Sequence, residues 1–130
     1  MNYAFNPLRG LIVVQAKVFG PSGSIVLRLA LDTGATRTMI NVAPLTTIGY
    51  DLALALDRVQ VTTGSGIEDV PRLLVTRFQA LGQTRENFPV LAHTLPPSAS
   101  IDGLLGLDFL HGQILTIDFL QGDISLHQPD

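Results

Sequence analysis

The chain has 130 residues, a length typical of one domain, and its 46% hydrophobic and 15% charged residues exclude a disordered protein. The formal net charge is −3 and the eight basic residues are scattered, which argues against nucleic acid or an anionic membrane as a partner. The absence of cysteine excludes disulfides and thiolate metal sites. We therefore expect a single domain over residues 1–130.

Short apolar runs rich in Val, Ile and Leu, bounded by Gly, Pro, Asn or Asp, recur along the chain and predict strands. Tight turns are expected at residues 20–23, 81–83 and 120–123, and a hairpin tip at Gly64-Ser65-Gly66. The predicted strands cover residues 10–19, 24–31, 56–63, 67–78, 86–92, 113–119 and 123–127.

Two short helices are expected among these strands. Residues 42–48 have Asn41 as a candidate N-cap, Pro44 in the first turn and Gly49 at the end. Residues 104–110 (LLGLDFL) are apolar on most sides, which predicts a buried helix ending before Gly112. The fold class predicted is all-β, a closed or strongly folded barrel with one or two short helices.

No leader or membrane-spanning segment is recognisable in the sequence. Met1 is followed by neither a basic segment nor a long apolar one, and the apolar run at residues 11–14 is too short to cross a bilayer. A cytoplasmic protein with no membrane contact from this segment is the default expectation. The sequence equally allows a domain cut from a longer chain.

One carboxylate stands at the end of a strongly apolar strand, in residues 29–40 (LALDTGATRTMI). A carboxylate buried there without a partner would be costly, so Asp32 should be paired, protonated or functional. Gly34 permits a tight turn whose N–H approaches the carboxylate, and Thr33 adds a hydroxyl that can bond locally or across a symmetric contact. Taken alone, these three residues more commonly form an ordinary Asx-type turn at the end of a strand.

The whole stretch resembles the active-site signature of aspartic proteases, in which apolar residues lead into Asp-Thr-Gly-Ala. Residues 101–110 (IDGLLGLDFL) resemble the family's second element, carried by Leu104, Leu105 and Gly106. Residues 61–67 (VTTGSGI) stand where the family's flap hairpin is expected. The resemblance spans residues 10–127 and is closest to the single-domain, retropepsin-like group, including its bacterial members.

This resemblance implies an aspartic endopeptidase with Asp32 as the catalytic residue and with no cofactor. Aspartic proteolysis needs two carboxyl groups that share one proton, so that one acts as base and the other as acid. A second Asp-Thr-Gly is absent from the sequence. The second Asp32 must then come from a second chain, which implies a two-fold homodimer with the active site on its axis.

The resemblance also implies roles for the neighbouring residues. Thr33 would interlock with its symmetry mate, the Gly34 N–H would support the carboxylates, and Ala35 would lie beside an extended peptide or protein substrate. The hairpin over residues 59–72 would close over that substrate. Its expected tip residues are Thr63, Gly64, Ser65 and Gly66.

Two positions depart from the retroviral pattern. Retroviral relatives carry an Asp after the Ala and an Arg after the second-element Gly, and these two pair; here Thr36 and Leu107 replace both, so no unpaired charge remains. Asp108 is interpreted as a hydrogen-bonding residue of a helix or loop rather than a second catalyst. The three histidines match no metal-ligand pattern, so no metal is expected.

Two rival interpretations remain open at this point. The first is a catalytically idle dimerisation or peptide-binding module with the same fold. The second is a monomer that becomes active only on concentration or on release from a larger precursor.

Overall fold

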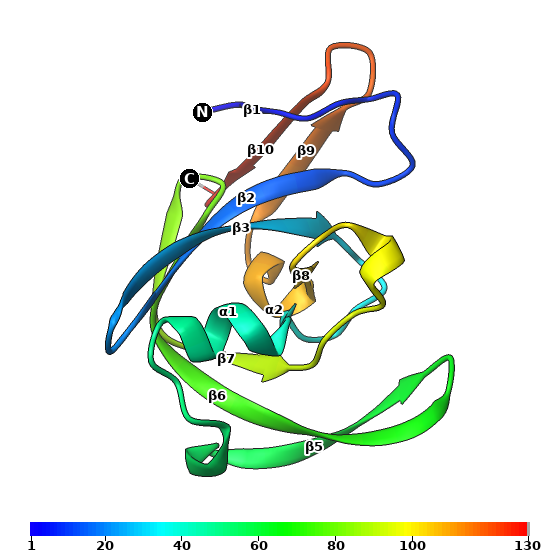
Figure 1. The fold of residues 1–130 in the computed structure, drawn as a ribbon. Helices are drawn as coiled ribbons and strands as arrows, with labels where there is room; N and C mark the ends of the chain where they lie inside the picture. Colours follow the sequence, from blue (N-terminus) through cyan, green and yellow to red (C-terminus); the bar gives the residue numbers. More distant parts are fainter. Residues whose placement is uncertain (130) are drawn as a thin grey trace.

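The structure, a computed structural model, describes residues 1–129; residue 130, the last of the expected domain, lies outside the described residues. The described chain is mostly β, with two short α-helices and two single 3-10 turns (Figure 1). The strands are β1 (Tyr3–Ala4), β2 (Val13–Gly20), β3 (Gly23–Leu31), β4 (Met39–Ile40), β5 (Asp57–Thr63), β6 (Gly66–Ala80), β7 (Gln83–Ala92), β8 (Gly103–Leu105), β9 (Ile114–Asp118) and β10 (Asp123–His127). The helices are α1 (Val42–Thr47) and α2 (Leu107–Leu110), and the 3-10 turns are η1 (Leu52–Leu54) and η2 (Pro97–Ala99).

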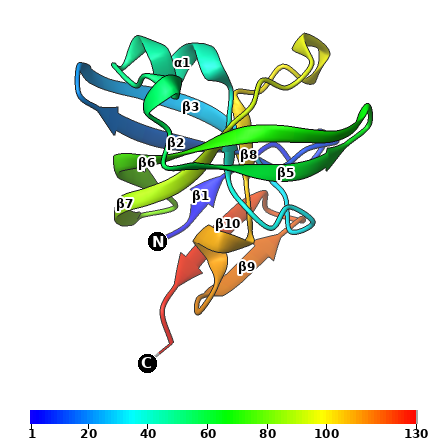
Figure 2. The same cartoon turned by 90° about the horizontal axis from the view of Figure 1, so that it is seen from below.

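Six strands close into a barrel in the order β2-β3-β8-β4-β7-β6, because β2 also pairs with β6. Strand β5 pairs with β6 outside this ring, and the two extend as a hairpin beyond the barrel (Figure 2). A separate three-stranded sheet has the order β1-β10-β9 and joins the two ends of the chain. The predicted all-β barrel is confirmed.

The strands predicted from the sequence are all present, with small shifts at their ends. The predicted helix over residues 104–110 is wrong in its first half, because residues 103–105 form β8 and only residues 107–110 are helical. Periodicity cannot distinguish a short, wholly apolar strand from a buried helix. Strand β8 lies between β3, with which it is parallel, and β4, with which it is antiparallel, so its apolar residues are enclosed by neighbours on both edges.

The helix expected at residues 42–48 is present as α1, but the cap expected from Asn41 is not formed. Asn41 occupies the N-cap position, yet its side-chain oxygen accepts from the Leu95 N–H (3.0 Å). The first N–H of the helix, at Val42, donates instead to the Thr94 hydroxyl (3.1 Å). Asn41 therefore fastens the loop after β7 to α1.

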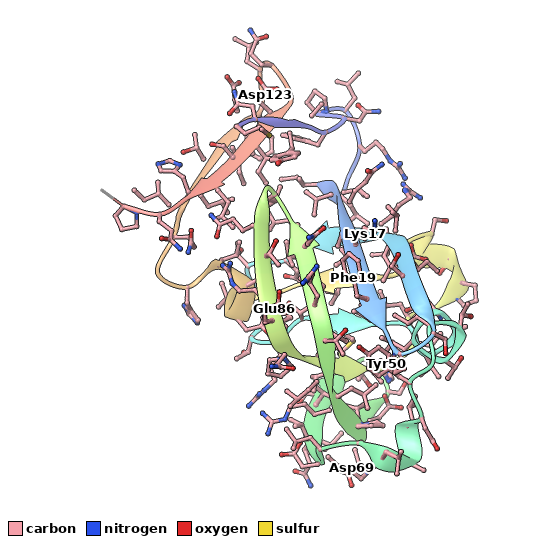
Figure 3. All side chains as sticks on the ribbon, turned by 90° about the vertical axis from the view of Figure 1, so that its left-hand side faces the viewer. Lys17, Phe19, Tyr50, Asp69, Glu86 and Asp123 are labelled. Carbon is pink, nitrogen blue, oxygen red and sulfur yellow. The ribbon has the colours of Figure 1, made fainter. Side chains whose placement is uncertain are left out.

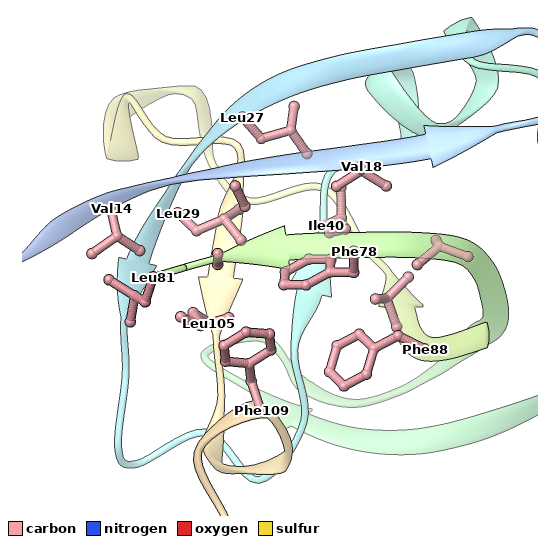
Figure 4. Packing of buried hydrophobic residues seen from close by; sticks show 14 of the residues in the cluster. Val14, Val18, Leu27, Leu29, Ile40, Phe78, Leu81, Phe88, Leu105 and Phe109 are labelled. Carbon is pink, nitrogen blue, oxygen red and sulfur yellow. The ribbon is translucent and has the colours of Figure 1, made fainter. Parts of the chain in front are cut away.

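The main core fills the barrel with aliphatic side chains and a cluster of three rings (Figure 4). The ring centroids of Phe78 and Phe88 are 4.9 Å apart, and Phe109 of α2 lies 5.4 Å from Phe78 and 5.9 Å from Phe88. Leu29 and Leu105, one on β3 and one on β8, have no exposed surface. Packing of these two side chains in the core fixes the ends of β3 and β8. The starting points of the loops that follow the two strands are therefore fixed as well.

Among residues 1–129, no helix has both the length and the apolar character needed to cross a membrane.

Candidate functional site

Asp32 follows the last residue of β3, where the strand leaves the core. Its backbone N–H donates to the carbonyl of Leu105 in the neighbouring strand β8 (3.0 Å). The preceding residues Leu29 and Ala30 are buried, whereas Asp32 is half-buried. The strand is therefore rigid up to the carboxylate, and the carboxylate itself reaches the surface of the single chain.

The Asp-Thr-Gly turn folds back on the carboxylate as the sequence predicts. The Gly34 N–H donates to Asp32 Oδ1 (2.9 Å), and the Ala35 N–H donates to the Asp32 carbonyl (3.1 Å). Thr33 and Gly34 are exposed and Ala35 is half-buried. The Thr33 hydroxyl makes no hydrogen bond within residues 1–129, so it is available to a partner outside the chain.

The second sequence element lies directly against this loop. Leu104 and Leu105 pair in parallel with Ala30 and Leu31 of β3, and Gly106 follows at the turn into α2. A Cβ on Gly106 would lie 2.7–2.9 Å from backbone atoms of Arg37 and Ala35. Only glycine allows the two backbones to approach this closely.

Leu107, which stands where retroviral relatives carry an arginine, contributes through its backbone. Its N–H donates to the Ala35 carbonyl (2.9 Å), while its neighbour Gly106 packs on the same loop. Thr36 and Arg37, on the other side of this contact, are exposed. The loop is thus held by main-chain hydrogen bonds rather than by a charge pair.

A buried hydrogen-bond network closes the base of the loop. The Thr38 hydroxyl accepts from the Gly106 N–H (3.1 Å) and donates to Asp108 Oδ1 (2.7 Å). The Asp108 carboxylate also accepts from the Thr38 N–H (3.0 and 2.9 Å). The interpretation of Asp108 as a hydrogen-bonding residue is confirmed. Thr38 was not predicted, because its partners stand about seventy positions further along the chain and no local signal marks it.

The expected flap residues form the tip of the β5–β6 hairpin, which points away from the barrel in Figures 1 and 2. Thr63 pairs with Gly66, and the Thr63 hydroxyl donates to the Gly66 carbonyl (3.2 Å) and accepts from the Ser65 N–H (3.2 Å). Gly66 has a φ of +118°, which L side chains rarely adopt. Gly64, Ser65 and Gly66 are exposed.

An ion pair and a small apolar cluster fix the other end of this hairpin. Arg72 donates two hydrogen bonds to Asp57 (2.8 and 2.6 Å), and these bonds, followed by the charge of Asp57, raise the pKa of Arg72 above its usual value. Beneath the hairpin, a second apolar cluster separate from the barrel core has Met39, Val70 and Leu91 as its buried members. The hairpin is thus anchored at its base and free at its tip.

One histidine lies beside a carboxylate of this hairpin. His93 lies 3.4 Å from Glu68 of the hairpin, and no group of three potential ligands is found among residues 1–129. A hollow of about 920 Å³ and another of about 300 Å³ share no lining residue with the Asp32 loop.

Comparisons with known proteins match both the sequence and the fold. A family model described as aspartyl protease matches residues 14–109. A retropepsin-like aspartic protease from Rickettsia conorii has a similar solved structure, with a TM-score of 0.70 at 18% identity, over 98% of this chain and 89% of that chain. A search of curated proteins gives no match.

Proposed function

The chain belongs to the aspartyl protease family, and from this premise we propose that it is an aspartic endopeptidase that acts as a homodimer. The observation that carries the proposal is the half-buried Asp32, which follows a rigid strand in a turn that donates an N–H to its carboxylate. In this proposal residues 1–130 are a single retropepsin-like domain, and each chain supplies half of the active site.

The proposed reaction uses two Asp32 carboxyl groups that share one proton. The ionised carboxylate takes a proton from a water molecule, whose oxygen attacks the carbonyl carbon of the peptide bond. The protonated carboxyl donates to the carbonyl oxygen as negative charge develops there. Proton transfer to the leaving nitrogen then breaks the C–N bond, and one water is consumed for each bond cleaved.

Asp102, Asp108 and Asp118 are occupied by structural hydrogen bonds. Asp102 Oδ2 accepts from the Arg28 N–H (2.7 Å), and Asp108 is bonded to Thr38. Asp118 Oδ1 accepts from two N–H groups of the turn that follows β9 (both 2.9 Å). A second carboxyl for catalysis is therefore best supplied by a second copy of Asp32.

The free edge of β9 supports a second copy as the partner. Within residues 1–129, β9 pairs only with β10, so its other edge offers unpaired N–H and C=O groups. Exposed apolar side chains continue from this strand into its turn: Ile114 (46%), Phe119 (62%) and Leu120 (88%). Figures 1 and 2 both show this edge on the same side of the molecule as the loop after β3. A two-fold axis on that side would bring the β9 strands together antiparallel and the two Asp32 loops to one centre.

The remaining roles follow from this arrangement. Thr33, whose hydroxyl makes no hydrogen bond within the described chain, would bond its symmetry mate, and the Gly34 N–H would hold the carboxylate in place. Ala35 would border an extended substrate. The hairpin is held by the Arg72–Asp57 pair at its base and by the approach of His93 to Glu68 further along. Its tip, Thr63 to Gly66, lies beyond these contacts and would close over that substrate.

The test compares the wild type with Asp32→Asn and with Asp123→Asn, a matched change on β10. Cleavage of denatured casein is measured from acidic to neutral pH with and without pepstatin, and the oligomeric state is measured by light scattering. Asp32→Asn should lower the rate by at least about a hundredfold without changing the dimer, whereas Asp123→Asn should not alter the rate. Turnover by Asp32→Asn would contradict the proposal. So would a dimer that binds peptides but cleaves none, which is the behaviour of an idle module.

A further inference from the structure

A groove of about 920 Å³ lies on the outer face of the barrel. Its floor is formed by β2, the adjoining part of β3 and the turn between β6 and β7, and its wall by the segment that contains β1 and residues 5–11. Figure 3 shows this face, with Lys17 labelled on β2. The groove shares no residue with the site built on Asp32.

The charge of the groove is opposite to that of the protein. The chain carries a net charge of −3, yet the groove is lined by Arg9, Lys17 and Arg28 and by no acidic side chain. These three cations have no carboxylate within 4.0 Å among residues 1–129, whereas Arg58, Arg72 and Arg77 do. The basic residues that look scattered in sequence are thus partly gathered by the fold.

The strand register explains why two of the cations are neighbours. Arg28 pairs with Gln15, and Lys17 pairs with Val26 of β3 on one side and Gln79 of β6 on the other. Arg28 and Lys17 are therefore diagonal neighbours on one sheet face, with their backbone positions about 7–8 Å apart. Arg28 Nη1 donates to the Ser100 carbonyl (3.1 Å) and Lys17 Nζ lies 5.1 Å from the centroid of the Phe19 ring, so neither charge is neutralised and an anion would be attracted by both.

Polar groups without partners continue the same row. Gln79 pairs with Thr84 in the next strand, so Lys17, Gln79 and Thr84 lie side by side across three strands. The side chains of Gln15, Gln79 and Thr84 make no hydrogen bond within residues 1–129. The next row on the same face of the same three strands is Phe19, Arg77 and Glu86, where Arg77 is already paired with Glu86 (2.9 Å).

We propose that this groove binds an acidic peptide segment in an extended conformation. The cations stand on three different segments of chain and do not converge on one point, which suits carboxylates distributed along a polymer better than one compact anion. The free amide and hydroxyl groups match a peptide backbone, and the exposed Leu11 and Val26 offer apolar contacts.

A nucleic acid fits the groove less well. Of its two aromatic residues, Phe5 is buried and Tyr3 is half-buried and packs against the barrel core, so neither offers a fully exposed ring for stacking a base. Three cations are also few for a phosphate backbone.

The test measures binding rather than catalysis, so its outcome does not depend on the proposed peptidase activity. Fluorescein-labelled peptides of twelve residues, alternating Glu with Thr or Gln with Thr, are titrated with the full chain at low salt and followed by anisotropy. The full chain carries Asp32→Asn so that neither probe is consumed. The Glu peptide should bind at least about tenfold more tightly than the Gln peptide.

Variants then locate the site. Lys17→Gln combined with Arg28→Gln should weaken binding of the Glu peptide about tenfold, whereas Arg77→Gln, the same change on the same sheet face, should alter it less than about twofold. Lys17→Glu combined with Arg28→Glu should reverse the preference, so that a Lys-Thr peptide binds best. Thermal unfolding of each variant checks that the fold is intact.

Three results would overturn the proposal. The first is equal affinity for the Glu and Gln peptides. The second is an equal loss of affinity in the Arg77→Gln control. The third is a single-stranded oligonucleotide that binds with the same dependence on Lys17 and Arg28 while the Glu peptide does not bind.

Discussion

Thr38→Val is the most direct test of how the Asp32 loop is held. Valine has nearly the same shape as threonine, so the change removes the hydroxyl without opening a cavity. Thr38 is fully buried, and its hydroxyl accepts from the Gly106 N–H and donates to the Asp108 carboxylate. Both bonds are lost, and the buried Gly106 N–H is left without a partner.

The expected loss of stability follows from those two bonds. An unsatisfied buried donor costs about 1–3 kcal/mol, and a hydrogen bond to a charged group contributes about 1.5–3 kcal/mol. Some of this is offset by the added apolar methyl group and by the two bonds that the Thr38 N–H keeps with Asp108. We expect the free energy of unfolding to fall by about 3 kcal/mol, which corresponds to roughly 10 °C in Tm for a domain of this size.

The measurement is urea denaturation of wild type, Thr38→Val, Thr38→Ser and Thr47→Val, all at one protein concentration because dimerisation would add to stability. Thr38→Ser keeps the hydroxyl and should retain most of the stability. Thr47→Val removes an exposed hydroxyl that donates to the Ala43 carbonyl, and it should change stability by less than about 0.5 kcal/mol. A Thr38→Val loss no larger than that of Thr47→Val would refute the network as the support of the loop.

Four further predictions follow from the same geometry. Gly106→Ala should destabilise the chain by about 1–3 kcal/mol in urea denaturation, because its Cβ would meet the backbone of residues 35–37, whereas Gly64→Ala, with nothing within 4 Å, should be neutral. Tyr50→Phe should cost about 1–2 kcal/mol in the same assay, since the hydroxyl donates to the Phe19 carbonyl (2.6 Å) and accepts from the Thr76 N–H (2.8 Å); an unchanged midpoint would contradict this. Ile114→Lys should weaken dimerisation at least about tenfold in sedimentation equilibrium, while Leu74→Lys, a similar change on β6, should not. The rate of casein cleavage should fall on both sides of an acidic window, because two ionised carboxyl groups lack the acid and two protonated ones lack the base; a rate that rises steadily to pH 8 would exclude the shared proton.

The sequence was sufficient for features that depend on neighbours along the chain. Alternating apolar residues and the Gly20–Gly23 turn predicted the β2–β3 hairpin, and Asp-Thr-Gly predicted a turn in which the Gly34 N–H meets the carboxylate. Both depend on residues only a few positions apart. The family resemblance was likewise visible in the stretch around Asp32.

Features that depend on distant neighbours were decided by the tertiary structure. Residues 103–105 are a strand because β3 and β4 lie on either side of them, although their own apolar pattern suits a helix equally well. Asn41 does not cap α1, because its side-chain oxygen accepts from the Leu95 N–H in the segment after β7. Thr94 of the same segment accepts from the first N–H of the helix instead.

The same distinction applies to the two sites. Sequence alone identified Asp32, but it did not reveal that Thr38 and Asp108 lock its loop, nor that cations from three segments line one groove. Side chains far apart in the chain acquire a common environment only when strands pair, because register determines which of them share a face. The chemistry of a single residue can be predicted from its local sequence, whereas the residues that hold it in place are set by the fold.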